Sequence, residues 1–205
     1  EVIEDSLGYA ESKNVSICME VHAPLLLKGP FVTSYIEMIE RTGTKFAGIV
    51  PDLAIFTKKI NQPLIDKALR DGAEPEIVDE IQRTFAENRG RDLSDFAEEI
   101  KAKTTNEATL GVLNAGLRLP WNDPEELRDF ARYIKHVHGK FYHMTEDCVD
   151  EGIACEEVYK VLKDIGFDGY ICSEFEGQRY YPEDNMVDEV EQVRRHHVQM
   201  HRCLD

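Results

Sequence analysis

Residues 134–141 (Ile-Lys-His-Val-His-Gly-Lys-Phe) constrain the fold more than any other stretch of this chain. Polar and apolar side chains alternate along them with a period of two, which predicts a β-strand. His136, His138 and Lys140 share one face, and Val137 lies on the other. Two imidazoles and an ammonium do not fill an ordinary apolar core. The strand therefore has one face that packs on a helix and one face that is free for chemistry.

Three further runs, residues 15–22, 46–52 and 170–176, divide into an apolar and a polar face in the same way. The first two are separated by a helical pattern of about ten residues, and this strand–helix–strand order predicts parallel pairing. In parallel α/β folds, functional sites form at the carboxyl ends of the strands. Four side chains fall at or near such ends: Glu20, Asp52, His138 and Glu174.

Three carboxylates and one imidazole suit a hard or borderline divalent cation, namely Mn²⁺, Mg²⁺, Co²⁺ or Zn²⁺. A set of four protein ligands leaves coordination positions open for substrate oxygens. A single glutamate at a strand end is usually a solvated rim residue, but the recurrence on four strands favours a metal site. Three more side chains share faces with these ligands, and we expect them to bind substrate: His22, Lys140 and Glu176.

The remaining histidines are expected to have structural or solvated roles. His136 lies deeper in its strand, which favours a hydrogen-bonded core residue. His196, His197 and His201 fall on the last predicted helix, where we expect an exposed polar face.

Residues from about 56 to 121 interrupt the alternation of strands and helices. They contain charged amphipathic helices at 63–70, 75–88 and 93–103 and no clear strand. This is too long for an ordinary connection, so we interpret it as a helical insertion at the strand end where a site would form. It either covers the pocket or serves only as a packing subdomain. With the other helices, expected at 1–13, 31–41, 122–134, 155–165 and 186–204, the chain reads as a single α/β domain over residues 1–205.

Composition excludes several classes of protein. The net charge of −16 argues against nucleic-acid binding, which needs clustered lysine and arginine. No apolar run is long enough to cross a membrane. The five cysteines are odd in number and lack CxxC spacing, which favours a reduced, cytoplasmic protein. Cys18 and Cys172 fall inside strand patterns, where we expect small buried residues.

These motifs resemble a known family. Ile17-Cys18-Met19-Glu20-Val21-His22, Gly48-Ile49-Val50-Pro51-Asp52, His136-Val137-His138-Gly139-Lys140 and Tyr170-Ile171-Cys172-Ser173-Glu174-Phe175-Glu176-Gly177 are similar to successive strand motifs of the xylose isomerase-like TIM barrels. This is the sugar phosphate isomerase/epimerase group. The resemblance implies that the chain holds the C-terminal half, strands five to eight, of a (β/α)8 barrel. It also implies that Glu20 and Glu174 act as acid and base as well as metal ligands.

The resemblance leaves the reaction open. A metal-dependent sugar isomerase or epimerase, which moves a proton next to a carbonyl, is the first expectation. Three features resemble C-glycoside deglycosidase catalytic subunits instead: Pro51-Asp52, the run Glu174–Arg179 and the long insertion. Ile55 also stands where ketose 3-epimerases have a substrate-binding histidine. The alternatives are therefore a C-glycoside-cleaving lyase subunit or a non-catalytic barrel fragment. Four parallel strands leave sheet edges open, so we expect either a homo-oligomer or a barrel completed by an N-terminal half that precedes Glu1.

Overall fold

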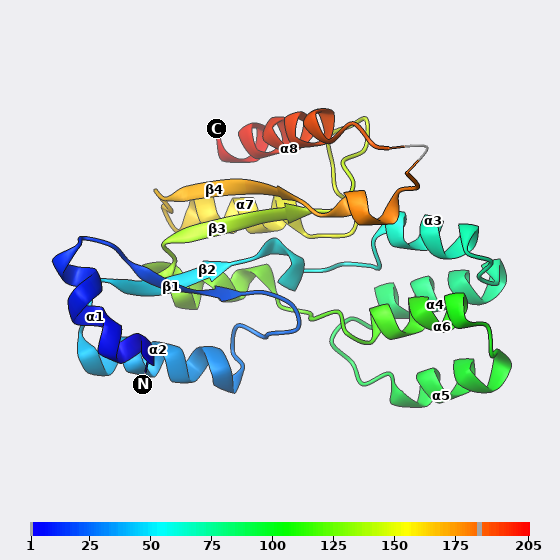
Figure 1. The fold of residues 1–205 in the computed structure, drawn as a ribbon, viewed down its shortest axis with the longest axis horizontal. Helices are drawn as coiled ribbons and strands as arrows, with labels where there is room; N and C mark the ends of the chain where they lie inside the picture. Colours follow the sequence, from blue (N-terminus) through cyan, green and yellow to red (C-terminus); the bar gives the residue numbers. More distant parts are fainter. Residues whose placement is uncertain (1, 184–185) are drawn as a thin grey trace.

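The computed structural model of the protein describes residues 2–183 and 186–205. Short parallel strands lie side by side and alternate with helices along the chain (Figure 1). The elements are α1 (Val2–Ser12), β1 (Ile17–Val21), α2 (Pro30–Thr42), β2 (Ala47–Pro51), η1 (Leu53–Ile55), α3 (Gln62–Arg70), α4 (Pro75–Glu87), α5 (Ser94–Lys103), α6 (Glu107–Gly116), η2 (Pro124–Tyr133), β3 (His136–Phe141), α7 (Cys155–Asp164), β4 (Tyr170–Phe175), η3 (Gly177–Tyr180) and α8 (Glu189–Leu204).

The strands form two parallel pairs, β1 with β2 and β3 with β4. Isolated parallel bridges, Ile49 to Ile134 and Asp52 to His138, join β2 to β3. The predicted parallel α/β architecture is thus confirmed. Within residues 2–183 and 186–205 the strands form two small sheets, linked by these bridges, and no closed barrel. The half-barrel interpretation stays a prediction.

The pairing between β2 and β3 changes register by one residue. From the first bridge to the second, the chain advances three positions on the β2 side, from Ile49 to Asp52. On the β3 side it advances four positions, from Ile134 to His138. Gly48 permits the close approach, because a Cβ atom there would lie 2.6 Å from the carbonyl oxygen of Tyr133. The shift has one consequence for the site: it sets His138 beside Asp52.

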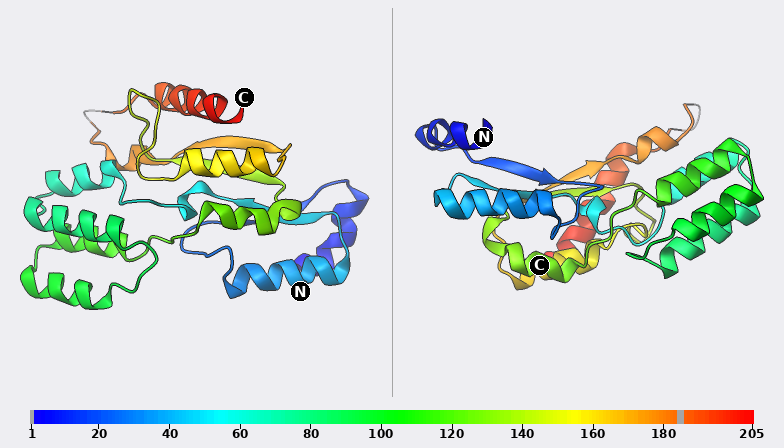
Figure 2. Two further views of the ribbon diagram at one scale, coloured as in Figure 1. Left: turned by 180° about the vertical axis from the view of Figure 1, so that it is seen from behind. Right: turned by 90° about the horizontal axis from the view of Figure 1, so that it is seen from below.

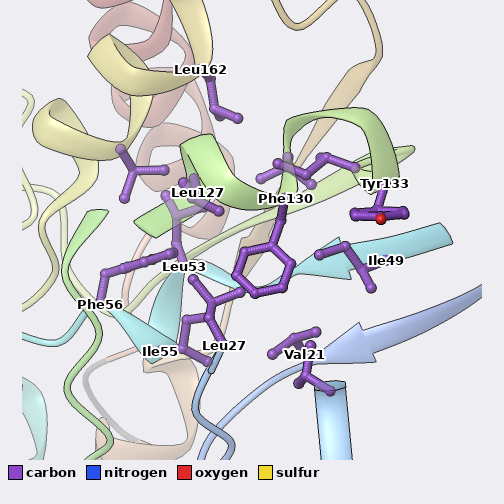
Figure 3. Close-up of a cluster of buried hydrophobic side chains, with 14 of the residues drawn as sticks. Val21, Leu27, Ile49, Leu53, Ile55, Phe56, Leu127, Phe130, Tyr133 and Leu162 are labelled. Carbon is purple, nitrogen blue, oxygen red and sulfur yellow. The ribbon is translucent and has the colours of Figure 1, made fainter. Parts of the chain in front are cut away.

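Helices cover one side of the strands. Figure 2 (right) shows α2, η2 and α7 below the sheet, whereas α1 lies above it at the end away from the insertion and the rest of that face is largely bare. The main core gathers between these layers, where the buried side chains of Val21, Ile49, Leu127 and Leu162 meet (Figure 3). The predicted division into an apolar and a polar face therefore matches the layers of the fold for β1, β3 and β4, whereas every residue of β2 is buried.

The insertion has a core of its own. Helices α3 to α6 surround a second apolar cluster that includes Ile65, Ile81, Ile100 and Leu113. They lie beyond the carboxyl ends of the strands (Figure 1). Asn122 ties the base of this unit to the α/β part, because its Oδ1 accepts a hydrogen bond from Leu27 N at 2.7 Å and its Nδ2 donates to Ile55 O at 2.9 Å.

The structure corrects several local expectations. The insertion holds a fourth helix, α6, whose sequence includes two glycines that weaken its helical pattern. Residues 124–133 form a 3₁₀-helix rather than an α-helix. Cys172 is exposed rather than buried, because β4 lies at a sheet edge. None of the helices in the described part of the chain combines the length and apolar character needed to cross a membrane.

His196 was also expected on an exposed face, but it is fully buried. Its ring hydrogen-bonds the Tyr159 hydroxyl at 2.6 Å and the Ser173 hydroxyl at 2.8 Å, and it stacks on Phe141. Burial disfavours the charged imidazolium and lowers the pKa of His196 to about 3. Gly139 makes room for the ring, since a Cβ atom there would lie 2.9 Å from His196 Cε1.

The buried histidine predicts a pH dependence of stability. A neutral His196 in the folded state and an unfolded-state pKa near 6.5 mean that the unfolded chain gains a proton first as pH falls. We expect the contribution of His196 to the free energy of unfolding to be constant above about pH 7 and to decline as pH falls through about 6.5 toward the folded-state pKa. Urea denaturation at a series of pH values measures this.

The matched variants separate His196 from its neighbour. His196→Gln should lower stability at pH 7.5 by about 1–3 kcal/mol, because buried hydroxyls lose a partner, and should flatten the pH dependence. His197→Gln, at an exposed position on the same helix, should leave both unchanged. An equal pH slope in His196→Gln and the unsubstituted protein would contradict the assignment.

Candidate metal centre

The four residues expected to bind a metal come together at the carboxyl ends of the strands. Glu20, Asp52, His138 and Glu174 each offer one ligand atom, and these atoms all lie within 4.8 Å of one another. His138 Nδ1 lies 2.6 Å from Glu20 Oε1, a hydrogen bond that the carboxylate accepts. The same nitrogen lies 3.5 Å from Glu174 Oε2. One candidate ligand thus lies on each of β1, β3 and β4, and one lies directly after β2.

Asp52 is the most constrained member of the group. Its Oδ1 caps η1 by accepting a hydrogen bond from Ala54 N at 2.8 Å, and its side chain is fully buried. Burial raises the pKa of this carboxyl, although Lys140 and Ala54 act in the opposite direction. Its orientation is therefore fixed by the turn that follows β2.

Lys140 lies among the carboxylates rather than at the rim. Its Nζ is 2.8 Å from Asp52 Oδ2, 3.4 Å from Glu174 Oε1 and 3.3 Å from Glu176 Oε1, and its side chain is only 11% exposed. Burial acts against the charged ammonium, but these three anions outweigh it and raise the pKa of Lys140. Lys140 is thus a fixed positive charge beside the candidate ligands.

Two buried carboxylate oxygens of the site could accept a further hydrogen bond or bind a cation. Among the described residues, Asp52 Oδ2 and Glu174 Oε2 have no hydrogen-bond partner; the 2.8 Å contact between Asp52 Oδ2 and Lys140 is an ion pair without hydrogen-bond geometry. Buried carboxylate oxygens are normally satisfied, and bound cations are one way to do so. Together with a hard oxygen-rich donor set, these atoms fit a divalent ion.

The residues expected to contact substrate lie at different depths. Glu176 is close to Lys140 and also pairs with Arg179 at 2.9 Å. His22 directly follows β1 and is exposed. Sequence reasoning missed Arg179, although its spacing of three residues from Glu176 was a visible signal.

A groove of about 630 Å³ opens between the insertion and the loop that follows β1. Pro24 lines it on one side, and Arg89, Arg118 and Trp121 line it on the insertion side. Among the described residues neither Arg89 nor Arg118 forms an ion pair. The groove is basic in a protein whose net charge is −16. Trp121 therefore lines this groove, where it is close to the two arginines.

No family model matches the chain. It is 25% identical over 180 residues to a C-glycoside deglycosidase alpha subunit of Microbacterium trichothecenolyticum, covering 82% of this chain and 49% of the relative.

Two further relatives carry similar names. A 3'-dehydrocarminate deglycosidase alpha subunit of a Microbacterium species is 24% identical over 217 residues, covering all of this chain and 61% of the relative. A C-glycoside deglycosidase alpha subunit of Arthrobacter globiformis is 24% identical over 213 residues, with coverage of 100% and 59%. The chain thus spans about half to three-fifths of the length of these curated relatives. It is similar to enzymes named for their action on sugar conjugates.

The donor set predicts how the protein responds to metal. We expect Mn²⁺ to raise the melting temperature, because an ion that binds only the folded state stabilises it. Glu174→Gln should weaken Mn²⁺ binding more than about tenfold (~1.4 kcal/mol), since an amide is a poorer ligand than a carboxylate. Isothermal titration calorimetry measures the affinity.

The control is Glu146→Gln, which removes the same charge from an exposed position outside the site. It should leave Mn²⁺ affinity within about twofold of the unsubstituted protein, well under the ~1.4 kcal/mol of a tenfold change. Equal affinities in Glu174→Gln and the unsubstituted protein would exclude Glu174 as a ligand.

Proposed function

We propose that this protein is the metal-binding catalytic part of a C-glycoside deglycosidase, which breaks the carbon–carbon bond between a 3-keto sugar and its aglycone. The observation that carries the proposal is the group of three carboxylates and one imidazole whose ligand atoms lie within 4.8 Å. The names of the relatives support the reaction class, and one of them specifies a 3'-dehydro substrate. This favours the lyase alternative over the isomerase or epimerase expected first.

Glu20, Asp52, His138 and Glu174 are the residues that would hold the ion. When bound, a divalent cation supplies Lewis acidity that polarises a carbonyl and stabilises the negative charge next to it. Mn²⁺, Mg²⁺, Co²⁺ and Zn²⁺ are all compatible with this donor set. Lys140 adds a fixed positive charge on the same side, so that an anionic substrate oxygen is favoured there.

The chain's own side chains then move the protons. One carboxylate, Glu20 or Glu174, takes the proton from the sugar carbon next to the carbonyl. The released electron pair forms a carbon–carbon double bond as the bond to the aglycone breaks, and the aglycone carbon receives a proton. His138 shares its Nδ1 hydrogen bond with Glu20, so it can relay that proton or act as the base itself.

The partners follow from the same argument. The relatives are named alpha subunits, and this chain spans about half to three-fifths of their length. We propose that further barrel strands, together with a second type of subunit, complete the site around the bare face of the sheet. Association of two copies of this chain is the alternative. The substrate is a small sugar conjugate.

A sugar isomerase or epimerase remains the second candidate. Glu20 and Glu174 approach the same nitrogen of His138 from two strands, at 2.6 Å and 3.5 Å. Two carboxylates around one ion suit proton removal and return at a single carbon. Both candidates share the first step, so the fate of the aglycone distinguishes them.

The shared step predicts solvent exchange at the substrate carbon. In D₂O with saturating Mn²⁺, the protein should wash deuterium into the carbon next to the carbonyl of a 3-keto C-glycoside and release free aglycone. Glu20→Gln and Glu174→Gln should lower exchange at least about 10²-fold even when excess metal restores occupancy, because the amide cannot accept the proton. NMR of the substrate and chromatography of the aglycone measure the two outcomes.

Each result decides between the candidates. Exchange with release of the aglycone supports the lyase, and exchange without release supports an epimerase. Isomerisation without solvent deuterium would indicate a hydride shift and contradict proton transfer. Full activity when Glu20→Gln and Glu174→Gln are combined would exclude this site.

The groove beside Trp121 predicts an optical signal for substrate binding. Trp121 is the single tryptophan of the chain, so its emission reports this groove alone. We expect a 3-keto C-glycoside with an anionic aromatic aglycone to quench it, and Arg118→Ala to weaken that binding by up to about fivefold, since an ion pair with this exposed arginine is lost.

Arg83→Ala is the matched control, because Arg83 lies exposed on α4 of the same insertion outside the groove. Its affinity should equal that of the unsubstituted protein. Unchanged Trp121 emission at saturating substrate would place the substrate elsewhere. Point substitution is preferred to deletion of residues 61–105, because α6 packs on α3, α4 and α5 and would lose its core.

A further inference from the structure

A second group of metal-ligating side chains lies one step deeper on the same face of the strands. His136, His138 and Cys172 each offer one ligand atom, and these atoms lie within 4.8 Å of one another. The parallel register pairs His138 with Cys172 directly across β3 and β4. His136 is two residues before His138, with the ring centroids 5.7 Å apart and the planes at 83°. The three side chains therefore converge from two adjacent strands.

His136 and Cys172 have side chains that are free to bind a ligand. In the described part of the chain, neither the His136 ring nor the Cys172 thiol makes a side-chain hydrogen bond. Cys172 is exposed and His136 is half-buried, so an ion from solvent can reach them. His136 was expected to be a satisfied core residue, and its lack of a partner overturns that expectation. A half-buried imidazole and an accessible thiol side by side are a typical setting for a metal ligand.

The donor chemistry differs from that of the carboxylate centre. Two imidazole nitrogens and one thiolate form a softer set, which favours Zn²⁺, Co²⁺ or Cd²⁺ over Mg²⁺ or Mn²⁺. Tetrahedral Zn²⁺ with bonds of about 2.0–2.3 Å needs ligand atoms about 3.4–3.8 Å apart. The ligand atoms, now within 4.8 Å of one another, therefore have to move closer by rotation of the exposed Cys172 and half-buried His136 side chains, with water as the fourth ligand.

We propose that His136, His138 and Cys172 form a binding site for a thiophilic divalent cation that shares His138 with the carboxylate centre. The two centres depend on one imidazole. An ion held by Cys172 and His136 draws the His138 ring away from Glu20, and it thereby weakens binding of a hard ion at Glu20, Asp52 and Glu174. Binding of the soft ion does not depend on the proposed function; only its inhibitory effect on turnover does.

Titration with Co²⁺ alone tests the site directly. A cobalt–thiolate bond gives a near-ultraviolet charge-transfer band that oxygen and nitrogen ligands do not produce. We expect one equivalent of Co²⁺ to produce this band in the protein, and Cys172→Ser to abolish it. His136→Gln should weaken the Co²⁺ affinity read from the band at least tenfold. Cys18→Ser, which removes a half-buried thiol from β1, should retain the full band.

Competition with Mn²⁺ tests the shared ligand. One equivalent of Zn²⁺ should lower the Mn²⁺ affinity, followed by the electron paramagnetic resonance signal of free Mn²⁺, at least fivefold in the protein and in Cys18→Ser. Cys172→Ser and His136→Gln should show a smaller effect, because Zn²⁺ then acts only by direct exchange at the carboxylates.

A charge-transfer band that persists in Cys172→Ser, or no band at all, would overturn the proposal. So would an equal effect of Zn²⁺ on Mn²⁺ binding in all four proteins. A protein that shows the band and the competition but no deglycosidase or epimerase activity would instead overturn the proposed function and leave this site in place.

Discussion

The ion pair between Lys140 and Asp52 is the interaction on which the site depends. Asp52 is fully buried, and an unpaired carboxylate at that depth would be strongly destabilising. The Lys140 ammonium at 2.8 Å compensates this charge from the neighbouring strand. Because only isolated bridges join β2 to β3, this pair also forms a polar link between the two small sheets. It holds the strands in the register that sets His138 beside Asp52.

The backbone that makes this register possible is specified by small residues. Gly48 lets the segment before β3 approach β2 closely. That segment contains one residue more between its two bridges, Ile134 and His138, than β2 does between Ile49 and Asp52. Gly139 makes room for buried His196, which ties α8 to α7 through Tyr159 and to β4 through Ser173. The His138-Gly139-Lys140 sequence thus combines a candidate metal ligand, a close contact that glycine permits and a compensating charge. Substitution of the glycine would displace both functional neighbours.

Most of the correct predictions came from the local pattern of polar and apolar residues. Alternation along each strand indicated the parallel α/β architecture and the four side chains that meet, because a period of two determines the face on which a residue lies. Features that depend on contacts distant in sequence were not predictable. The residues next to His196 in the sequence are basic, which suggests an exposed helix face. Only its contacts with Phe141 and Tyr159 make His196 a core residue. Likewise α6 is stabilised by the core of the insertion rather than by its own propensity.

Exposure of the ligands bears on how the proposed chemistry could proceed. The side chains of Glu20, Glu174 and His138 are 39%, 35% and 29% exposed, whereas Asp52 is not exposed at all. Removal of a proton next to a carbonyl is favoured when water is excluded, because electrostatic stabilisation is then stronger. The open side of the site is the bare face of the sheet, opposite the helical layer (Figure 2). The proposed reaction therefore requires that face to be covered when substrate is bound. A partner that covered it would control access both to the carboxylate centre and to the histidine–cysteine group below it, so that the choice of ion and the exclusion of water would depend on the same surface.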